Sequence, residues 1–267
     1  MDISEFKLFD AHFHIIDPRF TLVPNQGYVP DRYTTRDYLE RVSAYRLVGG
    51  AVVSGSFQAF DQDYLVDALA RLGSAFTGVT QLPASFTDDD VLELHTAGVR
   101  AIRFNLKRGG SEDASRIDEM ARRVHELAGW HVELYVDSEE LAALYPVLAV
   151  LPALCIDHLG LSADGFADLL KLVEKGAKVK ASGFGRVQLD IPQALRDIQA
   201  ANPSALMFGT DLPSTRAARP YSDSDFRLVI DTLGEKAAQR VFYDNAAAFY
   251  GSGFQFACQQ QQGTRGH

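Results

Sequence analysis

Short apolar runs alternate along the chain with longer stretches in which apolar residues recur every three or four positions. Apolar runs of four to eight residues predict strands, whereas the longer spacing predicts helices with one buried face. Over residues 113–128, for example, Ile117, Met120 and Val124 keep the helical spacing, and Gly129 follows as a stop signal. Alternation of this kind is typical of βα units built around a parallel sheet.

The pattern contains eight strand candidates, each followed by a helix candidate. The expected strands are Lys7–Ile15, Gly50–Ser54, Phe76–Gln81, Val99–Leu106, His131–Val136, Leu154–His158, Lys178–Gly183 and Leu206–Asp211. The expected helices are Thr35–Arg46, Asp61–Leu72, Asp88–Ala97, Asp113–Ala128, Ser138–Val150, Ala163–Glu174, Pro192–Ala201 and Asp223–Leu233. Eight βα units occupy about 250 residues in a typical barrel, which agrees with the length of this chain.

A doubly wound sheet is the main alternative, and it usually carries a glycine-rich phosphate loop after its first strand. Here the first strand runs into His12, Phe13 and His14 instead. We therefore predict a single-domain α/β fold, a (β/α)8 TIM barrel that spans residues 1–253. Residues 254–267 include the run Gln259–Gln262 and show no periodicity, so we expect this tail to be disordered.

Composition and charge narrow the classes of function. With 46% apolar and 23% charged residues, the chain has the balance of a globular protein. Its net charge of −9, without a clustered basic face, argues against nucleic-acid or anionic-membrane partners. Cys155 and Cys258 are too few for a disulfide framework, and the sequence shows neither a signal peptide nor a long apolar span. We therefore expect a cytoplasmic protein.

Polar side chains collect at the ends of the expected strands, where barrel enzymes build their active sites. They are His12, His14, Arg103, Asn105, Tyr135, His158, Arg186 and Asp211. Because His12 and His14 are two positions apart, both side chains face the same side of a strand. An isolated pair of this kind is more often a pair of core histidines, but the histidine and the aspartate that end other strands favour a shared active site.

Several segments resemble the amidohydrolase superfamily, in particular its branch of 2-pyrone-4,6-dicarboxylate lactonases and sugar lactonases. The segments are Asp10–His14 (DAHFH), Arg100–Leu106 (RAIRFNL), Trp130–Val136 (WHVELYV), Ile156–Gly160 (IDHLG), Lys180–Gly183 (KASG) and Phe208–Pro213 (FGTDLP). The resemblance implies a distorted barrel that hydrolyses a cyclic ester. It also implies that Asp211 is the general base for water, and that His12, His14 and His158 polarise the substrate carbonyl directly or through a metal. Both roles suit these side chains chemically.

The resemblance leaves the metal content open. Binuclear members of the superfamily use a carboxylated Lys or a Glu on strand four and a His on strand five, where this sequence has Arg103, Asn105 and Tyr135. Arginine does not lose its proton to bind a metal. The remaining set, His12, His14, His158 and Asp211, suffices for one zinc or manganese ion. Because the lactonase branch includes metal-free members, we expect no metal, with a single divalent ion as the alternative.

The arginines suggest the class of substrate. In the dicarboxylate lactonases the residues that match Arg103 and Arg186 hold substrate carboxylates, and two guanidinium groups beside a hydrolytic centre suit that role. A buried salt bridge is the alternative for Arg103, and a solvated loop position is the alternative for Arg186. We expect Ser56, Tyr135 and Asn105 to contact the substrate as well. Arg216 and Arg219 are weaker candidates, and His95, His125 and His131 are expected to be structural.

We therefore expect a hydrolase (lactonase) that opens a small carboxylated lactone. A mononuclear-metal sugar-acid lactonase or a related decarboxylase is the alternative enzyme, and a ligand-binding barrel without catalysis is the alternative of another class. The sequence leaves open which lactone is used, the oligomeric state, and the conformation of the segment Asp17–Tyr33 after the first strand.

Overall fold

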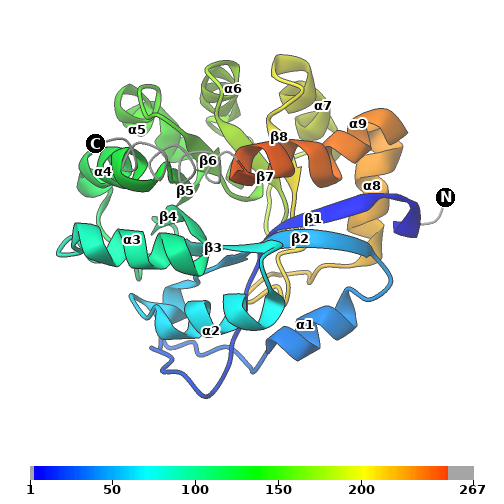
Figure 1. Ribbon diagram of the computed structural model, residues 1–267. Coiled ribbons are helices and arrows are strands. Elements are labelled where there is room, and N and C mark those ends of the chain that lie inside the picture. Colours follow the sequence, from blue (N-terminus) through cyan, green and yellow to red (C-terminus); the bar gives the residue numbers. More distant parts are fainter. Residues whose placement is uncertain (1–2, 252–267) are drawn as a thin grey trace, which may run out of the picture.

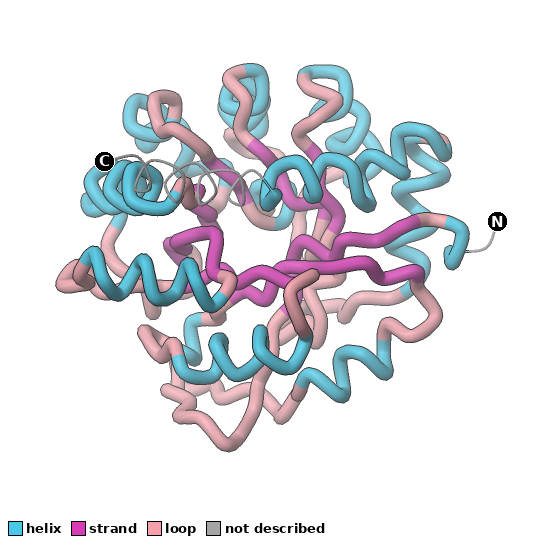
Figure 2. Tube along the Cα trace, viewed as in Figure 1, coloured by secondary structure: helices cyan, strands magenta, loops and turns pink. Residues whose placement is uncertain are grey.

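Eight parallel strands form one sheet in the order in which they occur along the chain, and helices surround it (Figure 1). The computed structural model describes residues 3–251, so the expected tail 254–267 lies outside the described residues. The strands are β1 (Lys7–Phe13), β2 (Arg46–Val53), β3 (Phe76–Thr80), β4 (Val99–Asn105), β5 (His131–Tyr135), β6 (Leu154–Ile156), β7 (Lys178–Ala181) and β8 (Leu206–Phe208). Figure 2 shows these strands in the centre of the molecule.

One helix follows each strand, and a further short helix follows the last one. The helices are α1 (Thr35–Arg41), α2 (Asp63–Leu72), α3 (Asp88–Ala97), α4 (Ile117–Ala128), α5 (Leu141–Leu148), α6 (Phe166–Glu174), α7 (Ile191–Ala201), α8 (Asp223–Leu233) and α9 (Glu235–Gln239). Local signals set several of these bounds. Thr87 caps the start of α3 through a hydrogen bond from the Asp90 N–H, and Gly98 ends that helix in the left-handed conformation.

Backbone hydrogen bonds join the first strand to the segment after the last and so close the barrel. The Asp211 N–H donates to the His12 carbonyl at 2.7 Å, and the His14 N–H donates to the Leu212 carbonyl at 2.8 Å. Gly209 permits this approach, because a Cβ atom there would lie 2.7 Å from the Cβ of His12. The predicted single-domain TIM barrel is confirmed, and its closure places Asp211 beside both histidines of β1.

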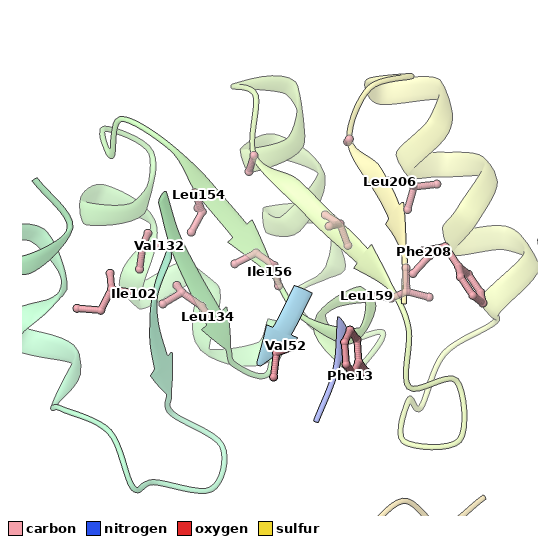
Figure 3. Packing of buried hydrophobic residues seen from close by; sticks show 14 of the residues in the cluster. Phe13, Val52, Ile102, Val132, Leu134, Leu154, Ile156, Leu159, Leu206 and Phe208 are labelled. Carbon is pink, nitrogen blue, oxygen red and sulfur yellow. The ribbon is translucent and has the colours of Figure 1, made fainter. Parts of the chain in front are cut away.

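Side chains alternate between the outside and the inside of the barrel. Figure 3 shows Val132 and Leu134 of β5 and Leu154 and Ile156 of β6 packed between the strands and the helices, and all four are buried. Burying one such side chain contributes about 1.5–3 kcal/mol to folding. The residues between them, which include Glu133, face the interior of the barrel.

The chain after α8 covers one end of the barrel interior. Figure 1 shows α9 and the turns that follow it beside β1 and β8, and the π-helical turn Arg240–Asp244 contacts both strands. Tyr250, on the helical residues 245–251, stacks on Phe9 with ring centroids 5.2 Å apart, and its hydroxyl donates to Glu133. The sequence reading placed no element in this region, which closes the barrel at the end opposite the strands' carboxyl termini.

Several predicted bounds were wrong at the element ends. The first helix ends at Arg41 rather than Arg46, because Arg46 already pairs with Lys7 in the β1–β2 ladder. The first, sixth, seventh and eighth strands end two or three residues earlier than predicted, so that His14, His158 and Asp211 lie just beyond the strands. Among residues 3–251, no helix is long and apolar enough to span a bilayer.

Candidate active site

A cavity opens at the carboxyl ends of the strands, and most of the predicted site residues line it. These are His14, Ser56, Arg103, Asn105, Tyr135, His158, Arg186 and Asp211. Phe57, Arg108, Thr215 and Arg216 line the same cavity. A second space of about 410 Å³ adjoins it and shares Arg108, Tyr135, Arg186 and Arg216. His12 is fully buried and lies behind this cavity rather than in its wall.

The backbone turns sharply where two of the site residues leave their strands. His158 has φ 52° and Asp211 has φ 58°, a left-handed conformation that is uncommon for residues with a side chain. Gly183 makes room for the imidazole of His158, because a Cβ atom there would lie 2.6 Å from its Nδ1. These turns direct both side chains toward β1, and strained backbone of this kind is common at functional sites.

Three imidazole nitrogens converge on one carboxylate oxygen. Asp211 Oδ1 lies 3.8 Å from His12 Nε2, 3.7 Å from His14 Nε2 and 3.9 Å from His158 Nε2. We call these four atoms the imidazole–carboxylate cluster. Among the described residues, neither Asp211 Oδ1 nor His12 Nε2 has a hydrogen-bond partner, although both are buried. Buried polar atoms are normally satisfied, so the cluster is arranged to receive something from the cavity.

Asp211 is ionised in this environment. Burial is the largest single influence and would raise the pKa of its carboxyl group, but the Arg186 guanidinium and the three histidines together outweigh burial and hold the pKa well below its usual range. Arg186 Nε donates to Asp211 Oδ2 at 2.6 Å. One oxygen of the carboxylate is therefore fixed by Arg186, and the other points toward the imidazoles without a donor.

The Nδ1 partners of the cavity histidines constrain their protons. His14 Nδ1 lies 2.7 Å from the Val53 carbonyl oxygen, which only accepts, so Nδ1 carries a proton. A neutral His14 then has a lone pair on Nε2. His158 Nδ1 lies 2.9 Å from Ser182 Oγ, a hydroxyl that can donate or accept. Burial lowers the pKa of His158 well below its usual range, so this ring is neutral and carries one proton.

A fully buried ionic layer lies beneath the cavity. The Lys180 ammonium forms an ion pair with Glu133 and lies 3.7 Å from Asp157 Oδ1. Arg103 donates to Asp157 Oδ2 from Nη2 at 2.8 Å and from Nε at 3.3 Å. Two cations thus face two carboxylates, and the layer is neutral when His12 is neutral. Burial lowers the pKa of His12 to about 4, although Asp157 opposes this shift.

Arg103 forms a buried salt bridge with Asp157, which was the alternative to its expected role in binding a substrate carboxylate. Its side chain also lines the cavity. Arg186 is nearly buried and contacts Asp211, rather than being a solvated loop residue. Arg216 binds the Asn25 side chain at 3.0 Å, and its guanidinium lies 4.4 Å from the ring centroid of Tyr28. The segment between β1 and α1 thus holds Arg216 at the edge of the cavity.

Comparison with known families finds a match to the amidohydrolase family over residues 9–252. This chain belongs to the amidohydrolase family. A 2-pyrone-4,6-dicarboxylate hydrolase from Comamonas testosteroni is 27% identical and covers 92% of each chain. A D-galactarolactone isomerase from Agrobacterium fabrum is 26% identical and covers 90% of each chain. An Agrobacterium tumefaciens protein of known structure shares the fold, with a TM-score of 0.80 and 22% identity over 91% of this chain and 95% of that chain.

Because amidohydrolases can hold metal ions, the imidazole–carboxylate cluster was compared with a metal site. Its atoms have the right chemical types, and separations of 3.7–3.9 Å suit ligands that share one ion. The fit then depends on the proton of His12. His12 Nδ1 lies 3.3 Å from both the Lys180 ammonium, which can only donate, and Asp157 Oδ1, which can only accept. A proton on Nδ1 leaves Nε2 a lone pair for a metal, whereas a proton on Nε2 does not.

Sequence reasoning missed the ionic layer of this amidohydrolase. Lys180, Glu133 and Asp157 are fully buried, and charged residues are rare inside short apolar strands. Their position within otherwise apolar runs was the available signal. His95, His125 and His131 have structural partners, as expected: His95 Nδ1 accepts from the Trp130 indole at 3.2 Å, His125 Nδ1 lies 3.0 Å from the Trp130 carbonyl oxygen, and His131 lies 3.0 Å from Glu133.

Proposed function

We propose that this chain hydrolyses a small carboxylated lactone without a metal ion, and that Asp211 is the general base. The observation that carries the proposal is the buried, ionised carboxylate of Asp211, whose Oδ1 has no hydrogen-bond partner among residues 3–251 and faces the cavity histidines. A carboxylate held in this way is ionised and is positioned to take a proton from a water molecule in the cavity. The curated relatives named above act, by their names, on a pyrone dicarboxylate and on a galactarolactone.

The reaction begins with a water molecule in the cavity beside Asp211 and His14. Water transfers one proton to Asp211 Oδ1 while its other O–H remains intact and can hydrogen-bond to the lone pair of His14 Nε2, and the water oxygen attacks the lactone carbonyl. The ring C–O bond then breaks, and the proton held by Asp211 passes to the departing ring oxygen. The balanced change is one lactone and one water converted to one hydroxy acid, or to its keto form when the released oxygen is enolic.

His158 is positioned to stabilise the oxyanion of the tetrahedral intermediate. When the Ser182 hydroxyl donates to His158 Nδ1, the single proton of the neutral ring lies on Nε2, which faces the cavity. A hydrogen bond of this kind strengthens as negative charge develops on the carbonyl oxygen. His12 lies behind the wall, so its role is to support Asp211 rather than to contact the carbonyl.

Three arginines suit a substrate that carries carboxylate groups. Arg108, Arg186 and Arg216 line both the cavity and the adjoining space, and they concentrate positive charge in an otherwise acidic protein. Guanidinium groups pair with carboxylates in a two-pronged geometry. Ser56 and Tyr135 line the same cavity as these arginines and the histidines, so they are candidates for hydrogen bonds to the ring.

The test is turnover of a panel of pyrone dicarboxylates, muconolactones and aldonolactones, with and without a chelator. We expect one class to be opened at an unchanged rate in chelator, and Asp211→Asn to lower kcat about 100- to 10,000-fold. Asp231→Asn, on the exposed face of α8, is the matched control and should keep wild-type turnover. Near-wild-type turnover by Asp211→Asn would refute the assignment of the base.

Isomerisation is a second candidate, because one curated relative is a lactone isomerase. The same base could move a proton on the lactone ring without adding water. Product analysis separates the two reactions: hydrolysis gives an open-chain acid that retains oxygen from labelled water, whereas isomerisation gives another lactone without it.

A further inference from the structure

Lys180 has no part in the reaction described above, yet its buried ammonium lies 3.3 Å from His12, a member of the cluster of groups that performs it. It lies on β7 with no exposed surface. Its ammonium contacts three groups: Glu133 Oε2, His12 Nδ1 at 3.3 Å, and Asp157 Oδ1 at 3.7 Å. Glu133 is in turn held by the hydroxyl of Tyr250 at 2.6 Å and by His131 at 3.0 Å. Lys180 is therefore fixed from several sides.

His12 Nδ1 faces two groups of opposite character. The Lys180 ammonium and Asp157 Oδ1 both lie 3.3 Å from it. Lysine has only donors, so it requires a lone pair on Nδ1, whereas the carboxylate would require a proton there. Asp157 has the larger electrostatic effect on the ring. Among the described residues, however, the ammonium contact has hydrogen-bond geometry and Asp157 Oδ1 makes no hydrogen bond, so the geometry favours the ammonium as the partner of Nδ1. The alternative tautomer, with the proton on Nδ1, would satisfy Asp157, and the Lys180 ammonium opposes it.

We propose that Lys180 is a positioning residue that keeps the proton of His12 on Nε2, and thereby prevents the imidazole–carboxylate cluster from binding a divalent metal ion. His12 Nε2–H then points toward Asp211 Oδ1, 3.8 Å away, and supports the negative charge of the base. Only the consequence of this inference, hydrolysis without a metal, rests on the proposed function. The tautomer and the exclusion of metal are properties of the free protein.

Removal of the ammonium should reverse the arrangement. Asp157 would then be the only charged group beside Nδ1, and Nδ1 would donate to it. The lone pair would move to Nε2, where His12, His158 and Asp211 present three ligand atoms within 4.8 Å of one another. A carboxylate that accepts from the far nitrogen of a histidine is the usual support of a zinc-bound imidazole, and such support changes metal affinity about 10- to 100-fold.

The variant that isolates this effect is Lys180→Met combined with Glu133→Gln. It removes both members of the buried ion pair, so that Arg103 and Asp157 still balance each other, whereas Lys180→Met alone would leave Glu133 as a buried unpaired carboxylate. Glu133→Gln alone keeps the ammonium next to His12. Lys171→Met, at an exposed position on α6, is the matched control for the lysine substitution.

Two measurements on the full chain test the proposal. Long-range 1H–15N spectra of histidine-labelled protein report which ring nitrogen of His12 is protonated, with the signals assigned by their loss in His12→Gln. Competition with a chromophoric chelator gives the affinity for zinc. We expect protonated Nε2 in the wild type, protonated Nδ1 in the double variant, and zinc binding about 10- to 100-fold tighter in the double variant than in the wild type. Both control variants should resemble the wild type.

Protonated Nδ1 in the wild-type protein would overturn the proposal, and this measurement needs no variant to fold. An unchanged zinc affinity in a double variant with a cooperative thermal transition would overturn it as well. Neither readout depends on turnover. If the lactone panel gives no product while the tautomer and zinc results are as expected, the proposed function fails and the role of Lys180 stands.

Discussion

The ion pair between Arg186 and Asp211 determines the charge of the proposed base, and its strength can be measured. Arg186→Met removes the guanidinium and keeps most of the apolar stem. Nε and Oδ2 are 2.6 Å apart, and both side chains are nearly buried. With the two charges centred about 4 Å apart and an effective dielectric constant of about 20, the attraction is about 4 kcal/mol. Removal of one partner of such a pair typically costs about 3–5 kcal/mol.

A double-mutant cycle separates this pair energy from other effects of the substitutions. Unfolding by denaturant is measured for the wild type, Arg186→Met, Asp211→Asn and the double variant at pH 7. We expect a coupling energy of about 3 kcal/mol, because the double variant has no unpaired buried charge. The exposed pair Arg122 and Asp118, 2.7 Å apart on α4, is the control, and its cycle should give below about 1 kcal/mol.

The pH dependence gives the same reasoning a second test. In the wild type the pKa of Asp211 is depressed, so its contribution to stability is complete above the ordinary carboxyl pKa and is lost only at lower pH. In Arg186→Met, burial without the guanidinium raises that pKa, so protonation relieves the unpaired charge. The stability difference between the two proteins should therefore shrink from pH 7 to pH 5. Additive effects in the cycle, or a difference that does not change with pH, would refute the assignment.

Two further predictions concern groups behind the cavity. Burial raises the pKa of Asp10 from its ordinary value to about 6, so the folded protein holds this proton more tightly than the unfolded chain does. The Asp10 contribution to stability should fall by up to about 3 kcal/mol as pH rises from 4 to 6, and Asp10→Asn should remove that slope in unfolding titrations. Ser182→Ala removes the partner of His158 Nδ1 and should lower kcat about 10-fold with little change in KM on the lactone that the panel identifies; an unchanged kcat would contradict the role given to His158.

The fold was accessible from the sequence because each βα unit carries its own signal. Alternate strand residues such as Val132 and Leu134 are buried on the side that faces the helices, and the helix stop at Gly129 is local as well. The structure of the chain after α8 could not be predicted from the sequence. Its apolar residues serve one end of the barrel, and Tyr250 finds Phe9 and Glu133 only after the barrel has formed. Contacts between residues 117 and 241 positions apart leave no periodic pattern.

The sequence predicted which residues form the site, but it did not predict how deep in the barrel each of them lies. The polar residues at the strand ends do meet, because parallel strands in a barrel present their carboxyl ends to one opening. Their level within the barrel depends on how strands shift against one another, and β1 has an irregularity in its register between Asp10 and Phe13. This irregularity accompanies the placement of His12 behind the wall while His14 reaches the cavity. A residue spacing of two could not distinguish these positions.

The three histidines illustrate why residue type alone does not determine the chemistry. All three direct Nε2 toward the same oxygen of Asp211, yet each Nδ1 has different neighbours: a carbonyl for His14, a hydroxyl for His158, and both an ammonium and a carboxylate for His12. A carbonyl or a carboxylate requires a proton on Nδ1, an ammonium requires a lone pair, and a hydroxyl permits either. Under the tautomer that we propose for His12, Nε2 of His14 accepts, Nε2 of His12 donates and Nε2 of His158 is adjustable. Such a set would suit a bound water, whereas the other His12 tautomer would suit a metal ion, and neighbours that are not themselves catalytic decide between the two.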